Sequence, residues 1–221
     1  MEAARLQIQY ANGASGKRHR KYIKPLRPLR SSTDDWKQHL PEAMPREPWK
    51  PLDIKGPTKT LILSDVHIPF HDTTSLALAI EYGVQHDADT VILNGDIMDH
   101  YALSRFLKDP RVRDFPGEVR LARQFLKALR KAFPKARIIW KHGNHEERYE
   151  NYMRAMAPDF IGVDAFEWAN VFSLSDFGVE MVGDKRTIRL GKIHVLHGHE
   201  YGGGIYAPVA ASRSMFLKAL S

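Results

Sequence analysis

The sequence predicts an α/β fold whose sheet is at least partly parallel. Short apolar runs rich in strand-forming residues alternate with segments whose apolar residues recur at helical spacing, from about residue 59 to residue 196. This alternation is typical of strands that are connected by crossover helices. The chain has 221 residues, of which 43% are hydrophobic, so it is long enough to bury the core of one domain.

The first half of this pattern contains three strands and two helices. A strand is expected at 60–64 and a helix at 73–86, because the apolar positions change from a continuous run to helical spacing. The second strand, 90–93, precedes the strongly amphipathic helix 117–132. The third strand is expected at 137–140. Each of these strands runs directly into polar residues.

The second half of the pattern consists of shorter elements. Helical spacing is present at 146–156 and again at 164–170. Strands are expected around 179–182, 186–190 and 192–196, and the last of them ends just before a histidine. No internal repeat or low-complexity tract interrupts the pattern, so we expect residues 59–221 to form one domain.

Residues 1–58 differ from the rest of the chain and are expected to form an arm or linker. They contain 7 of the 13 prolines, each of which fixes one backbone dihedral and removes a hydrogen-bond donor. Such a segment is unfavourable for a helix or a central strand, so an extended arm is predicted. Trp36 and Trp49 are its expected anchors on the domain that follows.

The positive charge of the chain is concentrated in this arm. The net charge is +7, with 33 basic and 26 acidic residues, and residues 1–60 account for all of the excess, whereas residues 61–221 are neutral. The run from Lys17 to Arg30 has seven basic residues and no acidic one. Two interpretations stay open: a solvated tail, or an arm that contacts a polyanion such as nucleic acid. The sequence does not favour a DNA-binding protein of the helix-turn-helix type, because the basic run is rich in proline.

Composition excludes several classes of protein. No apolar run approaches the ~18 residues that a membrane-spanning helix needs. The first ten residues lack the apolar stretch of a secretory signal. Cysteine is absent, which removes disulfides, thiolate zinc sites and cysteine nucleophiles. These features agree with a cytoplasmic protein.

Polar residues with metal-binding side chains follow four of the predicted strands. In open α/β sheets, ligands bind at the carboxyl ends of the strands, so these side chains are expected to meet in one pocket. Oxygen and nitrogen donors without sulfur suit divalent Mn, Fe, Ni or Zn, and a central carboxylate can bridge two ions in phosphoryl transfer. The candidates are Asp65, His67, Asp96, Asp99, Asn144, His145, His197 and His199.

These residues lie in four short motifs: Asp65-Val66-His67, Gly95-Asp96-Ile97-Met98-Asp99, Gly143-Asn144-His145-Glu146 and His197-Gly198-His199. In type and order the motifs resemble those of the calcineurin-like metallophosphoesterases, in particular a subgroup met in bacteriophages and prophages. The resemblance spans about residues 59–199 and implies a four-layer α-β-β-α sandwich with mixed sheets, acting in the cytoplasm of a bacterial or phage-infected cell.

The resemblance also implies a set of metal ligands. Asp65 and His67 would bind the first of two divalent ions, with Mn the favoured metal, and Asp96 would bridge the two ions. Asn144 and His197 would bind the second ion. The implied reaction is hydrolysis of a phosphate mono- or diester, including those of nucleic acid, by a hydroxide that bridges the ions.

Further residues near the motifs receive different roles. The resemblance implies that His145 contacts the scissile phosphate or protonates the leaving group, and that Asp99 orients His145. His199 is a further candidate ligand, with a pocket-lining loop residue as the alternative. Lys141 and Arg148 flank the third motif and are expected to be solvated, although contact with substrate phosphate is the alternative.

The closing Gly-His-X-His motif of the family is not found downstream of His199. Gly198 and His199 cannot supply it, because Tyr201 stands where the second histidine would be. We therefore expect an incomplete C-terminal part of the domain, with one ligand fewer at each ion unless water or another chain fills the position. This expectation keeps a second hypothesis open, a catalytically impaired module of the same fold that serves in binding or assembly.

Overall fold

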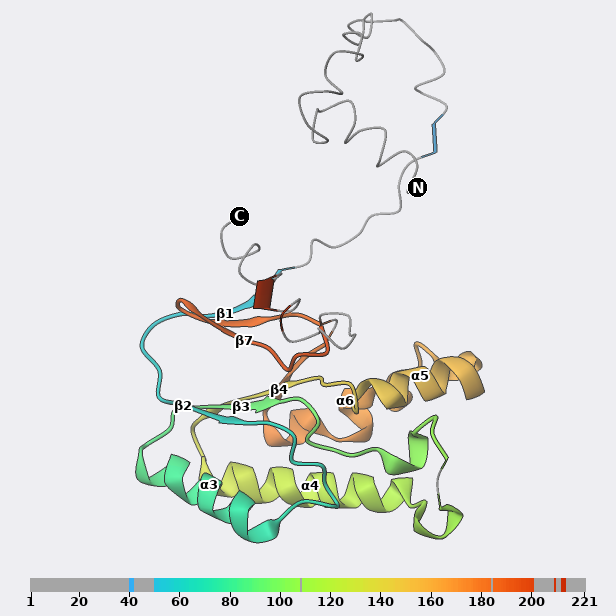
Figure 1. Cartoon of the computed structure of the whole chain (residues 1–221), viewed down its shortest axis with the longest axis horizontal. Helices are drawn as coiled ribbons and strands as arrows, with labels where there is room; N and C mark the ends of the chain where they lie inside the picture. The colour runs from blue at the N-terminus through green and yellow to red at the C-terminus, as the bar shows by residue number, and fades with distance from the viewer. Residues whose placement is uncertain are drawn as a thin grey trace, which may run out of the picture. The chain divides into compact units, whose positions relative to one another are not determined.

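Four of the predicted apolar runs form a parallel sheet in the order β2-β3-β4-β5 (Figure 1). Its strands are β2 (Thr60–Leu63), β3 (Thr90–Asn94), β4 (Arg137–Lys141) and β5 (Val179–Val182). All five residues of β3 are buried, and only the first residue of β4 is exposed. Both faces of the central strands are therefore covered, which explains why they are continuously apolar instead of alternating.

The computed structural model describes residues 40–41, 50–107, 109–183, 185–200, 209 and 212–213. The chain divides into two units, 1–47 and 48–221, and the fold described below belongs to the second unit. The predicted basic run, both anchoring tryptophans of the arm and the segment around Tyr201 lie outside the described residues.

Two long helices cover one face of the parallel sheet (Figure 1). They are α3 (Thr73–Gln85) and α4 (Phe115–Ala132), and each begins at an aspartate whose carboxylate accepts a hydrogen bond from a backbone N–H of the first turn. The buried face of α4 carries the apolar residues that its helical spacing predicted, which pack in one core with β3 and β4. They are Ala122, Phe125, Leu126 and Leu129.

The segment after β4 contains short helices. They are α5 (Glu147–Met156) and α6 (Trp168–Val171), with single 3-10 turns at Pro158–Phe160, Asp164–Phe166 and Leu174–Phe177. Two further 3-10 turns, Tyr101–Leu103 and Pro110–Val112, lie earlier in the chain, between β3 and α4. Trp168 and Trp140 of β4 meet edge to face with their ring centroids 4.9 Å apart. The helix expected at 164–170 is thus a 3-10 turn followed by α6.

A second sheet lies on the face of the parallel sheet that α3 and α4 leave free (Figure 1). It has the order β1-β6-β7, with β1 (Leu52–Ile54) parallel to β6 (Ile188–Leu190) and β6 antiparallel to β7 (Ile193–Val195). The α/β fold with mixed sheets is therefore confirmed. A separate apolar cluster includes residues of both sheets: Ile54, Ile92, Ile139, Val182, Ile188 and Val195.

Strand β1 lies within residues 1–58, so the prediction that this whole segment is an arm is wrong for 52–54, which pair with β6. Pairing with a distant strand decides this assignment, and local proline content does not reveal it.

The sandwich has three layers among the described residues, and the fourth, a helical layer outside the second sheet, stays a prediction. Within the described residues, no helix combines the length and the apolarity that a membrane crossing requires.

His142, the residue after β4, makes the domain sensitive to acid. Its side chain is 4% exposed and packs against the ring of Trp168, with centroids 4.5 Å apart. Burial lowers the pKa of this imidazole to about 4, compared with 6.5 when unfolded. Between these two values the unfolded chain binds a proton at His142 that the folded chain does not, so the contribution of this group to the stability falls as the pH falls.

We expect the His142→Gln variant to lose less stability than the wild type when the pH drops from 6.5 to 4. The difference in the change of the free energy of unfolding should be on the order of 3 kcal/mol, because each pKa unit corresponds to about 1.4 kcal/mol. Urea unfolding at a series of pH values measures it. Parallel pH profiles for the two proteins would show that His142 does not titrate in this way.

Candidate metal centre

The loops that follow β2 and β3 run side by side at one edge of the parallel sheet. Backbone hydrogen bonds join Asp65 N–H to the carbonyl of Gly95 at 3.1 Å and His67 N–H to the carbonyl of Asp96 at 3.0 Å. Asp65, His67 and Asp96 have φ values of 55°, 55° and 52°, in the left-handed region that residues other than glycine rarely adopt. Such backbone strain is found mainly at functional sites, where the surrounding structure maintains it.

Two glycines allow the loops to approach each other closely. A Cβ atom on Gly95 would lie 2.6 Å from the Nδ1 atom of His197, and one on Gly143 would collide with the Asp96 carboxylate. Gly95 also has a positive φ of 82°. Only glycine is therefore compatible with both the conformation and the space at this position.

A buried carboxylate, that of Glu146, holds the loop after β3 against the loop after β4. It accepts hydrogen bonds from the backbone N–H groups of Asp96 at 2.8 Å, Ile97 at 2.9 Å and Gly143 at 2.9 Å. The side chain is completely inaccessible to solvent. Glu146 belongs to the third motif, but its role could not be inferred from the sequence, because glutamate is rarely fully buried.

The first group of donor atoms consists of Asp65, Asp96 and His197, whose ligand atoms lie within 4.8 Å of one another. The Nδ1 atom of His197 donates to the backbone carbonyl of Asn94 at 2.8 Å, which leaves Nε2 facing Asp96 Oδ1 at 3.3 Å. The hydrogen bond to Asp96 raises the pKa of His197 to about 9. Burial opposes ionisation of Asp96, but hydrogen bonds from His197 and His145 outweigh it and lower the pKa of that carboxyl.

The second group consists of His67, Asp99 and His145, again with ligand atoms within 4.8 Å of one another. Asp99 Oδ2 accepts from His67 Nδ1 at 3.2 Å, so the Nε2 atom of His67 is left with a lone pair. This grouping differs from the pairing that the resemblance implies, in which His67 shares an ion with Asp65. The rings of His67 and His145 meet edge to face, 4.5 Å between centroids.

His145 is placed so that one nitrogen can exchange a proton. Its Nδ1 atom donates to the backbone carbonyl of Asp99 at 2.9 Å, and a carbonyl can only accept, so Nε2 is the atom that gains or loses a proton. Nε2 lies 3.7 Å from Asp96 Oδ2 and 2.8 Å from an Nη atom of Arg148. Burial opposes protonation of His145, but Asp99 and Asp96 outweigh it and raise the pKa of the imidazole.

Asn144 and His199 occupy different surroundings. The Oδ1 atom of Asn144 is 3.3 Å from His197 Nε2, at the edge of the first group of donors. His199 Nε2 is 3.0 Å from a carboxylate oxygen of Glu147, and its ring centroid lies 5.3 Å from that of His197. The structure thus brings Asn144 to the centre, whereas His199 is in neither group of three.

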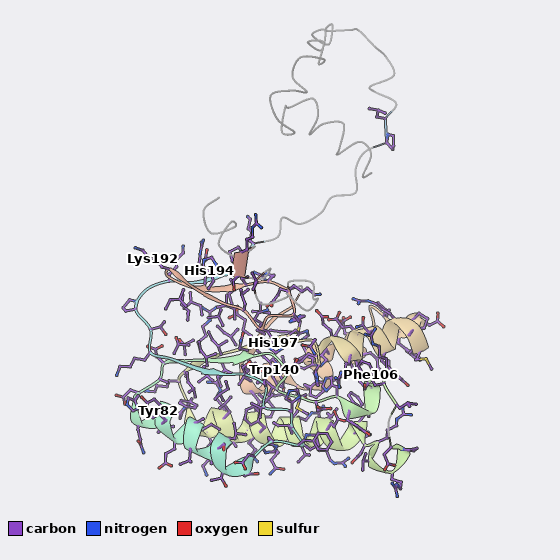
Figure 2. All side chains as sticks on the ribbon, viewed as in Figure 1. Tyr82, Phe106, Trp140, Lys192, His194 and His197 are labelled. Atoms are coloured by element: carbon purple, nitrogen blue, oxygen red, sulfur yellow. The ribbon has the colours of Figure 1, made fainter. Side chains whose placement is uncertain are left out.

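A buried ion pair fixes the loop that carries His197, which Figure 2 labels. Lys141, at the end of β4, is completely buried, and its Nζ atom lies 2.6 Å from Glu200 Oε1. Glu200 also accepts from the backbone N–H of His197 at 3.1 Å. Burial alone would raise the pKa of Glu200, but Lys141 lowers it to about 2. The prediction that Lys141 is solvated is therefore wrong. Its partner is 59 residues away in the chain, so the local sequence does not reveal the ion pair.

Arg148 is also not the solvated residue that the sequence predicted. Its side chain is 21% exposed, and it donates to the backbone carbonyl of Asp99 at 2.9 Å in addition to approaching His145. A guanidinium in this position keeps positive charge next to the two groups of donors. The flanking position in the motif was the one feature of the sequence that pointed to it.

The donor set is compatible with two divalent ions. Both groups of three consist of carboxylate oxygens and imidazole nitrogens, the ligands of Mn, Fe, Ni and Zn. His67 and His197 each direct Nδ1 at an oxygen acceptor, an arrangement that fixes the ring and turns Nε2 toward the other donors. A metal ion would take the place of the proton that His197 Nε2 now shares with Asp96.

A sequence model of the calcineurin-like phosphoesterase family matches residues 58–213. The chain belongs to this family. The resemblance noted from the motifs is thus confirmed, and the members of the family are phosphoester hydrolases that generally bind divalent metals.

Two curated relatives come from bacteriophages. The chain is 30% identical to the Gene 54 protein of Mycobacterium phage L5 over 149 residues and 28% identical to the Gene 54 protein of Mycobacterium phage D29. Each alignment covers 65% of this chain and 58% of the relative. The chain therefore matches little more than half the length of these relatives, which agree with the expected phage-type subgroup.

We predict that Glu146→Gln lowers the free energy of unfolding by about 3 kcal/mol. The amide would turn a donor toward backbone N–H groups that now donate to a buried carboxylate, and the loss of such charged hydrogen bonds costs about this much. Urea denaturation measures the change. Glu81→Gln on the exposed side of α3 is the matched control, and equal stability of the two variants would contradict the role given to Glu146.

Proposed function

We propose that this chain hydrolyses phosphate mono- or diesters with two divalent metal ions. The proposal rests on one observation: two groups of oxygen and nitrogen donors meet at the strand ends in a member of the phosphoesterase family. The phage relatives support a site of action in the cytoplasm of a bacterial host.

The ligands that we propose are five residues from four loops, with Mn the first choice of metal and Fe, Ni or Zn the alternatives. When bound, two such ions activate a water molecule and neutralise charge on the phosphoryl group. His199 is a sixth candidate, although its contact with Glu147 would first have to break. The five ligands are Asp65, His67, Asp96, Asn144 and His197.

His145 is the proposed proton donor to the leaving group. The hydrogen bond from its Nδ1 atom to the backbone carbonyl of Asp99 keeps the ring in one orientation, with Nε2 toward the centre. Nε2 accepts from Arg148 in the neutral imidazole, so Arg148 would have to turn away when Nε2 takes up the proton that it donates. Asp99 is a positioning residue in this scheme, because it contacts the rings of both His67 and His145. Arg148 adds a positive charge where a phosphate would bring negative charge.

Hydrolysis of bis-p-nitrophenyl phosphate in the presence of Mn should fall at least about 100-fold in the Asp96→Asn variant. The amide removes the charge that two imidazoles now face, and with it the proposed bridging ligand. The release of p-nitrophenol and titration calorimetry with Mn measure the two effects, with Asp87→Asn, an exposed carboxylate on a turn, as the control.

The outcomes separate the candidate functions. Absence of metal binding together with unaltered activity in the variant would contradict the metal-site proposal. Mn binding by the wild type without hydrolysis of mono- or diesters would favour the alternative, a catalytically impaired module for binding or assembly.

We also propose that the basic arm contacts nucleic acid, although it lies outside the described residues. Deleting residues 1–30 removes the run from Lys17 to Arg30, so binding of an oligonucleotide should weaken and depend less on salt. Fluorescence anisotropy at several salt concentrations measures both quantities. Equal affinity and equal salt dependence for the full chain and the shortened chain would contradict this role.

A further inference from the structure

A cavity of about 740 Å³ opens directly beside the metal centre. Asn144 and Arg148, both next to the proposed metal ligands, belong to its lining, and from there it extends between the segment 103–106 and the outer turns of α5. A phosphate group alone would occupy only a small part of this space, whereas ligand cavities of 300–1,000 Å³ hold molecules the size of a nucleotide.

The charge of the lining is positive. Three arginines contribute to it, Arg105, Arg113 and Arg148, against the single carboxylate of Glu147. That carboxylate is already engaged by His199 at 3.0 Å and Lys185 at 3.8 Å. Within the described part of the chain, neither Arg105 nor Arg113 has an ion-pair partner. Two guanidinium groups are thus available to an anion that extends outward from the centre.

Aromatic side chains accompany these arginines. Phe106 is 66% exposed, so its ring is open to solvent, and the guanidinium of Arg105 lies 5.3 Å from its centroid. Tyr152 of α5 is half-buried in the same lining. A groove that binds a single strand has two elements. Cationic side chains follow the phosphate backbone, and aromatic rings beside them stack on the bases.

We propose that this cavity is a groove that binds single-stranded nucleic acid, and that the natural substrate of the centre is a phosphodiester within such a strand. The inference rests on the proposed phosphoesterase function and adds the substrate class. Arg105 and Arg113 would contact the phosphates adjoining the scissile one, and an unpaired base would stack on Phe106. A small phosphomonoester would leave these three side chains without a contact.

The test compares a small substrate with an oligonucleotide in the full-length chain. Arg105→Ala combined with Arg113→Ala should weaken binding of a fluorescein-labelled 12-nucleotide oligothymidylate about 10-fold or more, measured by anisotropy with EDTA present to prevent turnover. The slope of log Kd against log salt should fall by about 1.4, because each phosphate contact on a single strand contributes about 0.7. Mn-dependent hydrolysis of bis-p-nitrophenyl phosphate should stay within about twofold of the wild type.

Phe106→Ala tests the stacking part separately. Loss of one stacked base should weaken oligothymidylate binding at least about fivefold, without changing the salt slope. Tyr82→Ala is the matched aromatic control, since Tyr82 is 62% exposed and lies at the opposite end of the domain (Figure 2). Arg120→Ala, on the exposed side of α4, is the matched control for the arginines.

Several outcomes would overturn the inference. The groove variants and their controls could bind the oligonucleotide with equal affinity while bis-p-nitrophenyl phosphate is still hydrolysed. That result would reject the proposed nucleic-acid groove and leave the phosphoesterase proposal intact. The same holds if only deletion of residues 1–30 weakens binding, if duplex DNA competes as well as the single strand, or if thymidine monophosphate competes as well as the oligonucleotide. A wild type that hydrolyses neither substrate would instead reject the proposed function itself.

Discussion

The geometry of the centre depends on the buried carboxylate of Glu146. Its two oxygens accept backbone hydrogen bonds from the loop after β3 and from the loop after β4, and so fix the distance between two strand ends. With the loops joined, Asp96 can hold its left-handed conformation and accept the backbone N–H of His145 at 2.9 Å. The positions of Asp96 and His145, one from each group of donors, therefore depend on a side chain that touches neither a metal nor a substrate in our scheme.

The ion pair between Lys141 and Glu200 extends this arrangement to the second sheet. His197 follows β7, whereas its neighbours in the centre follow strands of the parallel sheet, so the centre is complete only when the two sheets are held in register. Burying two charges carries a large desolvation cost that their attraction only partly offsets. An apolar pair could stabilise the fold equally well, but it could not accept the hydrogen bonds that Glu200 receives from the N–H groups of His197 and Gly198. We therefore infer that the ion pair serves to position the loop of His197.

The sequence predicted those features that follow from local patterns. Continuous apolar runs identified β2, β3 and β4, and the polar residues at their ends were expected to meet because parallel strands end at one edge of a sheet. Strand β1 was missed, because three residues in a proline-rich segment become a strand only through pairing with β6. Glu146 and Lys141 were missed for a related reason: charged residues are exposed by default, and their buried partners are distant in the chain.

Net charge gives an incomplete account of where this protein can meet an anion. Residues 61–221 are neutral in sum, yet the cavity beside the centre is lined by three arginines and one engaged carboxylate. The family motifs lie at the strand ends, whereas Arg105, Phe106 and Arg113 lie in the connection between β3 and α4, outside every motif. Family membership thus bears on the chemistry of the centre, and in our proposal the connecting segment bears on the choice of substrate. A loop is suited to this role, because loops tolerate change better than the strands they join.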